Sequence, residues 1–223
     1  MDERILEYRK LNKLFEKNGF KLYLVGGTVR DFLLGIPLSD MDAVSDATPE
    51  EMKAFLLDAD YTFERYGSVT VKTDKKVKFD ITTMREETSY LDARHPSKIS
   101  FIKDLSVDVK RRDFTINGLY LDSELKVIDY VDGQKDLKER VLRMIGNPDK
   151  RLKEDPLRII RAIRFAVDYN LSLDKDLEAA IINNAKELKR LNSEKIKQDL
   201  AKCKNANRSI VLQYLEKYHI KLD

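Results

Sequence analysis

The stretch Leu22–Ser45 reads LYLVGGTVRDFLLGIPLSDMDAVS. Its first apolar run stops at a glycine pair, Gly26 and Gly27, and a helical pattern follows over residues 28–34. That pattern ends at Gly35, a residue typical of the position just past a helix. Residues 41–44 then form a second short apolar segment that reads as a strand. This order of strand, glycine turn, helix and strand predicts a chain that begins with mixed helix and strand structure.

Two aspartates, Asp40 and Asp42, flank Met41 where the second strand begins. Residues i and i+2 of a strand point to the same face, so the two carboxylates would lie side by side and repel each other. Solvation in a polar turn relieves this repulsion, as does protonation of one carboxylate or a divalent cation between them. The pair alone leaves these alternatives open.

The composition limits the classes of protein to consider. Of 223 residues, 42% are hydrophobic and 36% are charged, which predicts a folded chain of one large domain or two small ones. No apolar run approaches the length of a membrane-spanning helix, so no membrane partner is expected. The single cysteine, Cys203, excludes an internal disulfide framework and favours a reducing compartment, and a cytoplasmic location is expected. The net charge of +3 predicts that local basic patches would hold any nucleic acid.

The rest of the chain divides into two parts by its hydrophobic patterns. The expected elements of the first part are a helix over 3–18, a helix that starts at 48–51, a hairpin of strands 68–73 and 77–83, and strands over 115–121 and 127–130. From residue 151 the pattern is helical almost to the end. We therefore expect an α+β fold, with a front part of residues 1–140 and an all-helical part of residues 141–223.

A third acid, Asp80 in KFDIT, lies between apolar residues of a predicted strand. If this strand lies beside the strand of Asp42, three carboxylates converge. The turn at Gly26 and Gly27 lets backbone N–H groups approach a phosphate closely, and the following helix start adds partial positive charge. Carboxylates beside bound phosphates can hold two Mg²⁺ ions, which activate an attacking hydroxyl and stabilise a leaving pyrophosphate. The constellation predicts nucleotidyl transfer.

Five segments follow one another in a set order: LVGGTVRDFLLG, SDMDAVSDATPEE, DITTMREETSYLDARHP, KRRDFTIN and EDPLRIIRAIRF. Together they resemble the class II tRNA nucleotidyltransferases, the family of CCA-adding enzymes and bacterial poly(A) polymerases, over about Leu22–Phe165. The resemblance implies a nucleotidyltransferase head with a mixed five-stranded sheet, followed by a helical neck. It also implies Asp40 and Asp42 as ligands of Mg²⁺, and Asp80 as a further catalytic acid.

The segment EDPLR allows two interpretations. Glu154 and Asp155 are predicted to start a helix, with Arg158 one turn beyond Asp155 on the same face, as in an ordinary i,i+3 salt bridge. Alternatively, a carboxylate and a guanidinium match the amine donor and ring-nitrogen acceptor that cytosine and adenine present. Guanine and uracil have the opposite polarity and would leave both groups unpaired, at about 1–3 kcal/mol each. The resemblance assigns the second role to Asp155 and Arg158, which would select CTP and ATP.

The run KRRDF is either a solvated basic run or, with a predicted strand directly after it, a set of residues that face a cleft. By resemblance its residues contact the ribose and triphosphate of an incoming nucleotide. Of two arginines further along the EDPLR helix, Arg161 is the better candidate for a triphosphate contact than Arg164. The expected nucleotide-binding residues are Gly26, Gly27, Arg30, Arg112, Asp113, Asn117, Asp155, Arg158 and Arg161.

The polar segment Arg85–Pro96 is predicted to be a flexible loop. Read from its residues alone, it is an ordinary surface loop. In the family, a flexible loop at this position is needed for the change from C to A addition, so its presence favours completion through A. The loop residues in family-like places are Arg85, Tyr90, Asp92 and Arg94.

The largest departure from the family is length, because its members commonly continue into body and tail domains that this chain lacks. The chain is either a compact form or a fragment. RNA would then be held by basic residues of the head and neck, and its binding would be weak or depend on a homodimer. The expected RNA-binding residues are Lys110, Lys150, Arg151, Lys189 and Arg190.

The expected activity is addition of CMP and AMP, from CTP and ATP, to the 3′ end of tRNA, with the 3′ end and acceptor stem bound. Narrower or related outputs remain alternatives: addition of A alone, addition of CC alone, or a poly(A) tail. A non-catalytic RNA-binding module and nucleotidyl transfer to a small molecule are further alternatives. Intact Asp40, Asp42, Asp155 and Arg158 argue against the module, and the EDPLR segment argues against the small-molecule acceptor.

Overall fold

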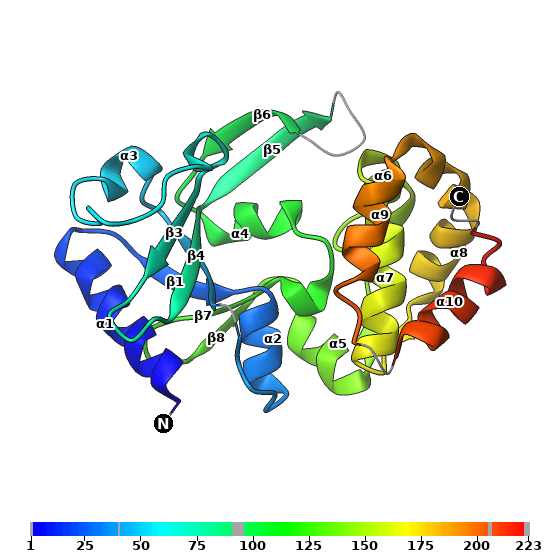
Figure 1. Ribbon diagram of the computed structural model, residues 1–223, viewed down its shortest axis with the longest axis horizontal. Helices are drawn as coiled ribbons and strands as arrows, with labels where there is room; N and C mark the ends of the chain where they lie inside the picture. Colours follow the sequence, from blue (N-terminus) through cyan, green and yellow to red (C-terminus); the bar gives the residue numbers. More distant parts are fainter. Residues whose placement is uncertain (1, 40, 91–95, 205–206, 221–223) are drawn as a thin grey trace. The chain divides into compact units, whose positions relative to one another are not determined.

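The computed structural model describes residues 2–39, 41–90, 96–204 and 207–220 (Figure 1). The chain forms two compact units that interleave along the sequence. The first unit comprises Met1–Glu87, Lys98–Arg112 and Ile116–Gly133. The second unit comprises Thr88–Ser97, Asp113–Thr115 and Gln134–Asp223. The expected division into residues 1–140 and 141–223 stays a prediction, because it is a single boundary and the two units alternate along the chain.

A mixed six-stranded sheet forms the centre of the first unit, in the order β3-β4-β2-β1-β7-β8. Its strands are β1 (Leu22–Val25), β2 (Met41–Ser45), β3 (Ser68–Lys72), β4 (Lys78–Thr83), β7 (Leu119–Leu121) and β8 (Val127–Asp129). Strands β2 and β4 are parallel, and the other neighbours are antiparallel. The expected α+β fold with a mixed sheet is confirmed. The count of five strands that the resemblance implies is too low by one, because all six strands expected from the hydrophobic patterns join the sheet.

Helix α1 (Glu3–Lys17) packs on this sheet through one apolar face. Ile5, Leu11 and Phe15 belong to the buried core, and the hydroxyl of the fully buried Tyr8 lies within 3.0 Å of the Leu22 carbonyl of β1. Burial of such side chains contributes about 1.5–3 kcal/mol each, so this face anchors α1 to the sheet. The other helices of the unit are α2 (Gly27–Leu33), α3 (Pro49–Met52) and α4 (Leu105–Asp108), with 3₁₀ turns η1 (Glu64–Tyr66), η2 (Val109–Arg111) and η3 (Thr115–Asn117).

The segment expected to be a flexible loop contains regular structure. β5 (Arg85–Tyr90) and β6 (Pro96–Phe101) form a separate two-stranded sheet. Residues 85–90 thus form a strand where a loop was expected, whereas the flexibility of this segment stays a prediction. Residues 91–95 lie outside the described chain.

Helices dominate the second unit, and Figure 1 shows most of them in yellow to red. They are α5 (Gly133–Glu139), which starts in the first unit, α6 (Pro148–Glu154), α7 (Leu157–Asp168), α8 (Lys175–Asn184), η4 (Ala185–Arg190), α9 (Ser193–Leu200) and α10 (Arg208–Lys217). The expectation of an all-helical part is wrong in one detail, because β9 (Val141–Leu142) pairs in parallel with β10 (Ser172–Leu173). No described helix combines the length and the hydropathy needed to cross a membrane.

Candidate functional site

The glycine turn lies between β1 and α2, as the sequence predicts. Gly26 has φ 66° and ψ −132°, a conformation that glycine adopts without a steric penalty and other residues avoid. A Cβ built on Gly26 would lie 3.8 Å from Oδ2 of Asp42, and a Cβ on Gly27 would lie at the same distance from it. The carboxylate of Asp42 therefore faces the glycine turn.

Strand pairing places Asp80 beside Asp42. The parallel strands β2 and β4 pair in a register that sets Asp42 opposite Asp80. Side chains that are paired across adjacent strands share one face of the sheet, so both acids lie on the same face. The expectation that the strand of Asp80 neighbours the strand of Asp42 is correct.

The two acids differ in their surroundings. Asp42 is exposed. Asp80 accepts a hydrogen bond from the Thr70 hydroxyl at 2.6 Å through Oδ1, and Nζ of Lys78 lies 2.7 Å from its Oδ2. Asp80 could bind a metal only if its carboxylate lost the contacts with Thr70 and Lys78. Its pairing with Asp42 nevertheless keeps it next to the candidate metal ligand.

The donor set fits a magnesium ion. Mg²⁺ prefers one or two carboxylates together with water and phosphate oxygens. Asp42 offers an exposed carboxylate beside a glycine turn whose backbone N–H groups could contact a phosphate. Its expected partner, Asp40, lies outside the described residues. Within the described ranges no group of three His, Cys, Asp or Glu residues is arranged to hold a metal.

Arg30 is buried next to the glycine turn, in a polar network of the first unit. Its Nη1 donates to the side-chain oxygen of Asn117 at 2.6 Å, and its Nε donates to Asp31 at 3.0 Å. Arg30 is only 4% exposed, and Asn117 is 6% exposed. The structure thus brings together two predicted nucleotide-binding residues that are far apart in sequence, with Arg30 in a supporting position next to the turn.

Asp108 holds two arginines of the KRRDF run, and the sequence did not single it out. This fully buried carboxylate pairs with Arg111 and Arg112, each at 2.8 Å, and accepts a hydrogen bond from the Tyr120 hydroxyl at 2.9 Å. Burial alone would raise the pKa of Asp108, but Arg112 and then Arg111 outweigh it and lower the pKa to about 2. The i,i+3 and i,i+4 spacing of an acid before two arginines was the available signal.

The surroundings of Arg112 correct another expectation. The segment after KRRDF is not a strand throughout, because residues 115–117 form η3 and the strand starts at Leu119. Arg112 is therefore not set by strand alternation. Its pKa is raised above its ordinary value, because Asp108 more than offsets the lowering by burial. Asp108 holds the charged guanidinium in place.

Asp113 and Arg161 meet within the second unit. Nη2 of Arg161 lies 2.5 Å from Oδ2 of Asp113. This charge pair is the main reason that the pKa of Arg161 is raised, against the effect of burial. Asp113 and Arg161 were predicted separately as nucleotide contacts. Their ion pair shows that each side chain restrains the position of the other.

The EDPLR segment spans a break between two helices instead of starting one. Helix α6 ends at Glu154, Asp155 has φ −142° and ψ 94°, and α7 begins at Leu157. The Asp155 carboxylate accepts a hydrogen bond from the Leu157 N–H at 3.1 Å, so it caps the start of α7. The expectation that Glu154 and Asp155 lie in the first turn of a helix is wrong, because the residue before a proline avoids the helical conformation.

Arg158 is buried, with 7% of its surface exposed. Its Nη1 donates to the Arg151 carbonyl at 2.8 Å and lies 3.5 Å from Glu154, and its Nε lies 4.0 Å from Asp155. The predicted pair of Asp155 and Arg158 is therefore close, and the strongest contact of Arg158 is with a backbone carbonyl. This anchoring fixes the guanidinium independently of Asp155.

The remaining predicted residues are distributed over both units. Arg85 lies in the first unit, where its backbone N–H donates to Asp108 at 3.2 Å and its guanidinium pairs with Glu87 at 2.7 Å. Tyr90 ends β5, whereas Asp92 and Arg94 lie outside the described residues.

The expected RNA contacts differ in exposure. Lys110, Lys150, Lys189 and Arg190 are exposed. Arg151 is 9% exposed, and its guanidinium donates to Glu154 at 2.9 Å. Arg151 is thus the least suited of the five to contact a phosphate backbone.

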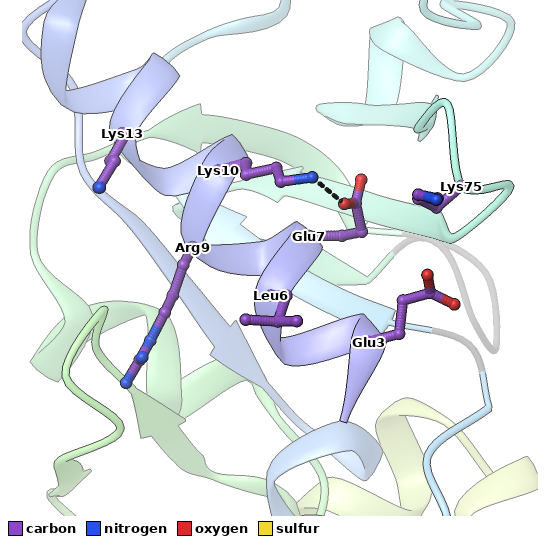
Figure 2. A pocket seen from close by; sticks show the side chains of 7 residues that line it. All are labelled: Glu3, Leu6, Glu7, Arg9, Lys10, Lys13 and Lys75. Carbon is purple, nitrogen blue, oxygen red and sulfur yellow. Dashed lines mark hydrogen bonds and ion pairs between the residues drawn. The ribbon is translucent and has the colours of Figure 1, made fainter. Parts of the chain in front are cut away.

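A groove of about 350 Å³ lies on α1. Figure 2 shows the side chains that line it. The groove is lined by Glu3, Leu6, Glu7, Arg9, Lys10 and Lys13 of α1 and by Lys75. The lining contains both acidic and basic side chains, and Nζ of Lys10 lies 2.6 Å from the carboxylate of the buried Glu7. None of the predicted site residues lines this groove, whose basic side chains outnumber its acidic ones by four to two.

A carboxylate that faces a glycine turn, with a second acid beside it on a parallel strand, is an arrangement that could hold nucleotide phosphates together with a divalent metal. The family model described as the poly(A) polymerase head domain matches residues 22–143. The chain belongs to this family.

Relatives with known names share the same region. A CCA-adding enzyme of Ligilactobacillus salivarius is 42% identical over 193 residues, which cover 85% of this chain and 48% of that protein. A CCA-adding enzyme of Staphylococcus epidermidis is 36% identical over 203 residues, which cover 91% of this chain and 50% of that protein. The chain spans about half the length of the curated relatives it matches.

Solved structures agree with this assignment. The CCA-adding enzyme of Bacillus stearothermophilus in complex with CTP superposes with a TM-score of 0.82 at 30% identity, covering 90% of this chain and 48% of that chain. The Thermotoga maritima CCA-adding enzyme complexed with tRNA gives a TM-score of 0.77 at 26% identity, covering 99% of this chain and 52% of that chain.

Proposed function

We propose that this protein is a Mg²⁺-dependent nucleotidyltransferase that adds CMP and AMP, from CTP and ATP, to the 3′ end of tRNA. The observation that carries the proposal is the register of β2 and β4, which sets Asp80 beside Asp42 at the glycine turn. The names of the relatives, and their complexes with CTP and tRNA, support the choice of nucleotides and of RNA.

The residues of the first unit serve the transfer. Asp42, with Asp40, would hold magnesium, which supplies activation of the 3′-hydroxyl and stabilises the leaving pyrophosphate when bound. The turn at Gly26 and Gly27 leaves room for phosphate oxygens next to the Asp42 carboxylate. Arg30 and Asn117 support this turn, because their buried hydrogen bond ties α2 to η3.

Asp155 and Arg158 of the second unit select the base. Arg158 donates to the ring nitrogen of cytosine or adenine, and Asp155 accepts from the exocyclic amine. The buried hydrogen bond from Arg158 to the Arg151 carbonyl supports this role, since it fixes the direction of the guanidinium before a base arrives. A fixed donor rejects guanine and uracil more strongly than a mobile one, because it cannot turn away from the mismatch.

The test uses purified protein with a tRNA that ends before CCA, and with each nucleoside triphosphate alone and in pairs. We expect CMP, CMP and AMP in that order, only with a divalent metal present. A product that stops at CC, a single A on a tRNA that already ends in CC, or a long A tail from ATP alone would identify one of the narrower outputs. If no nucleotide is transferred to any RNA end, RNA binding without catalysis would be the remaining function.

The low cysteine content supports a cytoplasmic location.

A further inference from the structure

A side chain from α2 holds the backbone of Asp42. The Asp42 N–H donates to the hydroxyl of Thr28 at 2.8 Å. Thr28 is 3% exposed and stands one residue beyond the glycine pair, in the first turn of α2. The bond joins the two sequence segments that the proposed chemistry requires, the glycine turn and the acidic strand.

The bond occurs where regular strand pairing stops. β1 and β2 pair from Leu22–Ser45 to Leu24–Ala43, and β1 continues for one more residue, Val25, before the chain turns at Gly26. One residue beyond the last of these pairs, the Asp42 N–H meets the Thr28 hydroxyl in place of a strand carbonyl. A hydroxyl that replaces a strand acceptor extends the hydrogen bonding on the β1 side of β2 by one residue.

We propose that Thr28 is a positioning residue for Asp42, whose hydroxyl fixes the start of β2 so that the Asp42 carboxylate faces the turn at Gly26 and Gly27. The inference rests on the proposed role of Asp42 as a metal ligand. Catalytic side chains must be held close to their working geometry by their neighbours, and a backbone bond at the residue itself restrains its Cα–Cβ direction directly. Threonine at this position thus has a function that a valine of the same shape would lack.

The first measurement is amide hydrogen exchange of Asp42, followed by NMR in the wild type, Thr28→Val and Thr28→Ser. Thr28→Val keeps the shape and removes the hydroxyl, and Thr28→Ser keeps the hydroxyl. We expect the Asp42 amide to exchange at least about ten-fold faster in Thr28→Val and to change little in Thr28→Ser, because an amide that has lost its acceptor exchanges more readily. This readout needs neither metal nor RNA.

The second measurement is binding of Mn²⁺ alone, followed by the EPR signal of the free ion. We expect Thr28→Val to weaken it about ten-fold, which corresponds to about 1.4 kcal/mol, and Thr28→Ser to bind within about two-fold of the wild type. A matched control is Thr83→Val. The Thr83 hydroxyl donates to the Ala47 carbonyl at 2.8 Å and is buried in the same sheet, so this variant loses a comparable bond far from the turn. Thr83→Val should lower the melting temperature and leave Mn²⁺ binding unchanged.

The outcomes separate this inference from the function on which it rests. Unchanged Mn²⁺ binding in Thr28→Val, or an equal loss in Thr28→Ser or Thr83→Val, would overturn the positioning role. Asp42→Asn is measured alongside. If Asp42→Asn binds Mn²⁺ as the wild type does, the metal role of Asp42 fails first, whatever Thr28 does. If Thr28→Val unfolds, Thr28→Ala is used in its place, since it also lacks the hydroxyl.

Discussion

The two residues on which the proposed function depends most, Asp42 and Arg158, are held in opposite ways. Asp42 is an exposed side chain on a regular strand, and its position follows from sheet register and from a bond to its backbone. Arg158 is a buried side chain just after a break between two helices, and its guanidinium is itself hydrogen-bonded to a carbonyl. The difference teaches that an exposed group can be removed at little cost to folding, whereas a buried one serves folding and function together.

The largest expected effect is the loss of transfer in Asp42→Ala. Loss of a metal-binding carboxylate removes several kcal/mol of transition-state stabilisation, about 10³-fold or more in rate. Because Asp42 is exposed, the melting temperature should stay close to that of the wild type. Asp40→Ala should also abolish transfer. Single-nucleotide incorporation measures the transfer, and thermal melting measures the stability. Near wild-type turnover in Asp42→Ala would contradict the proposed role of Asp42 as a metal ligand.

The second effect tests whether burial, and not membership of one unit, decides the cost to folding. Asp108 belongs to the same unit as Asp42 but is fully buried between Arg111 and Arg112. Asp108→Asn removes the buried carboxylate that Arg111 and Arg112 share, although Arg111 keeps a longer contact with Glu87 at 3.7 Å. We expect the free energy of unfolding to fall by about 3–5 kcal/mol. Chemical denaturation at neutral pH measures it. A loss below about 1 kcal/mol would show that the network is solvated.

The same variant gives a pH test with a definite sign. The folded-state pKa of Asp108, about 2, lies below the value of about 3.9 expected in the unfolded chain. The ionised carboxylate therefore stabilises the fold fully above about pH 4, and this contribution is lost as the pH falls toward 2. The difference in unfolding free energy between the wild type and Asp108→Asn should stay constant above pH 4 and shrink below it.

Regular strands explain why the first region could be predicted from the sequence. Period-two alternation fixed β3 and β4, and the neighbourhood of Asp80 and Asp42 followed once their strands were adjacent. The EDPLR segment was harder to predict, because the i,i+3 spacing of Asp155 and Arg158 does not show that one helix ends and another begins there. The signal was present in Pro156, which disfavours a helical conformation at Asp155.

Other misses came from contacts that no local pattern carries. η3 forms where a strand was expected, because the Thr115 hydroxyl donates to Asp136 at 2.7 Å and the Thr115 N–H donates to the Arg143 carbonyl. These partners are distant in sequence. The roles of Asp155 and Arg158 as base-selecting residues, and of the segment 85–96 in A addition, remain predictions.

The third effect concerns Arg158, where function and folding should be lost together. Arg158→Ala removes a hydrogen-bond donor that suits the ring-nitrogen acceptor of cytosine and adenine but not the groups that guanine and uracil present there. The preference for C and A over G and U should therefore fall by about 1–3 kcal/mol, roughly five- to 150-fold. It should also lower the melting temperature, because Arg158 is buried and bonded to the Arg151 carbonyl. Incorporation of all four nucleotides measures the preference.

Arg164→Ala is the matched control for this change. Arg164 lies on the same helix, is similarly buried, and pairs with Asp199 at 3.0 Å. We expect Arg164→Ala to lower the melting temperature and to keep the preference of the wild type. If Arg158→Ala behaves in the same way as this control, the pair of Asp155 and Arg158 is a structural salt bridge and the base-selecting role is lost.

The smallest expected effect is a loss of RNA affinity on replacement of exposed lysines in the second unit. It tests whether exposed residues of that unit, like Asp42, can be replaced at little cost to folding. Lys150 and Lys189 are exposed, so Lys150→Ala and Lys189→Ala should leave folding unchanged, as Asp42→Ala does. Each should weaken RNA binding by a similar factor for every sequence and lower the slope of log affinity against log salt by about 1, because one phosphate contact and its released counterion are lost. Arg151→Ala is the contrasting variant, since Arg151 is buried and paired with Glu154, and it should lower the melting temperature more than the salt slope. Fluorescence anisotropy with an acceptor-stem minihelix at several salt concentrations measures the slopes. An unchanged slope in both lysine variants would place the phosphate contacts elsewhere, with Lys110 and Arg190 as the next residues to replace.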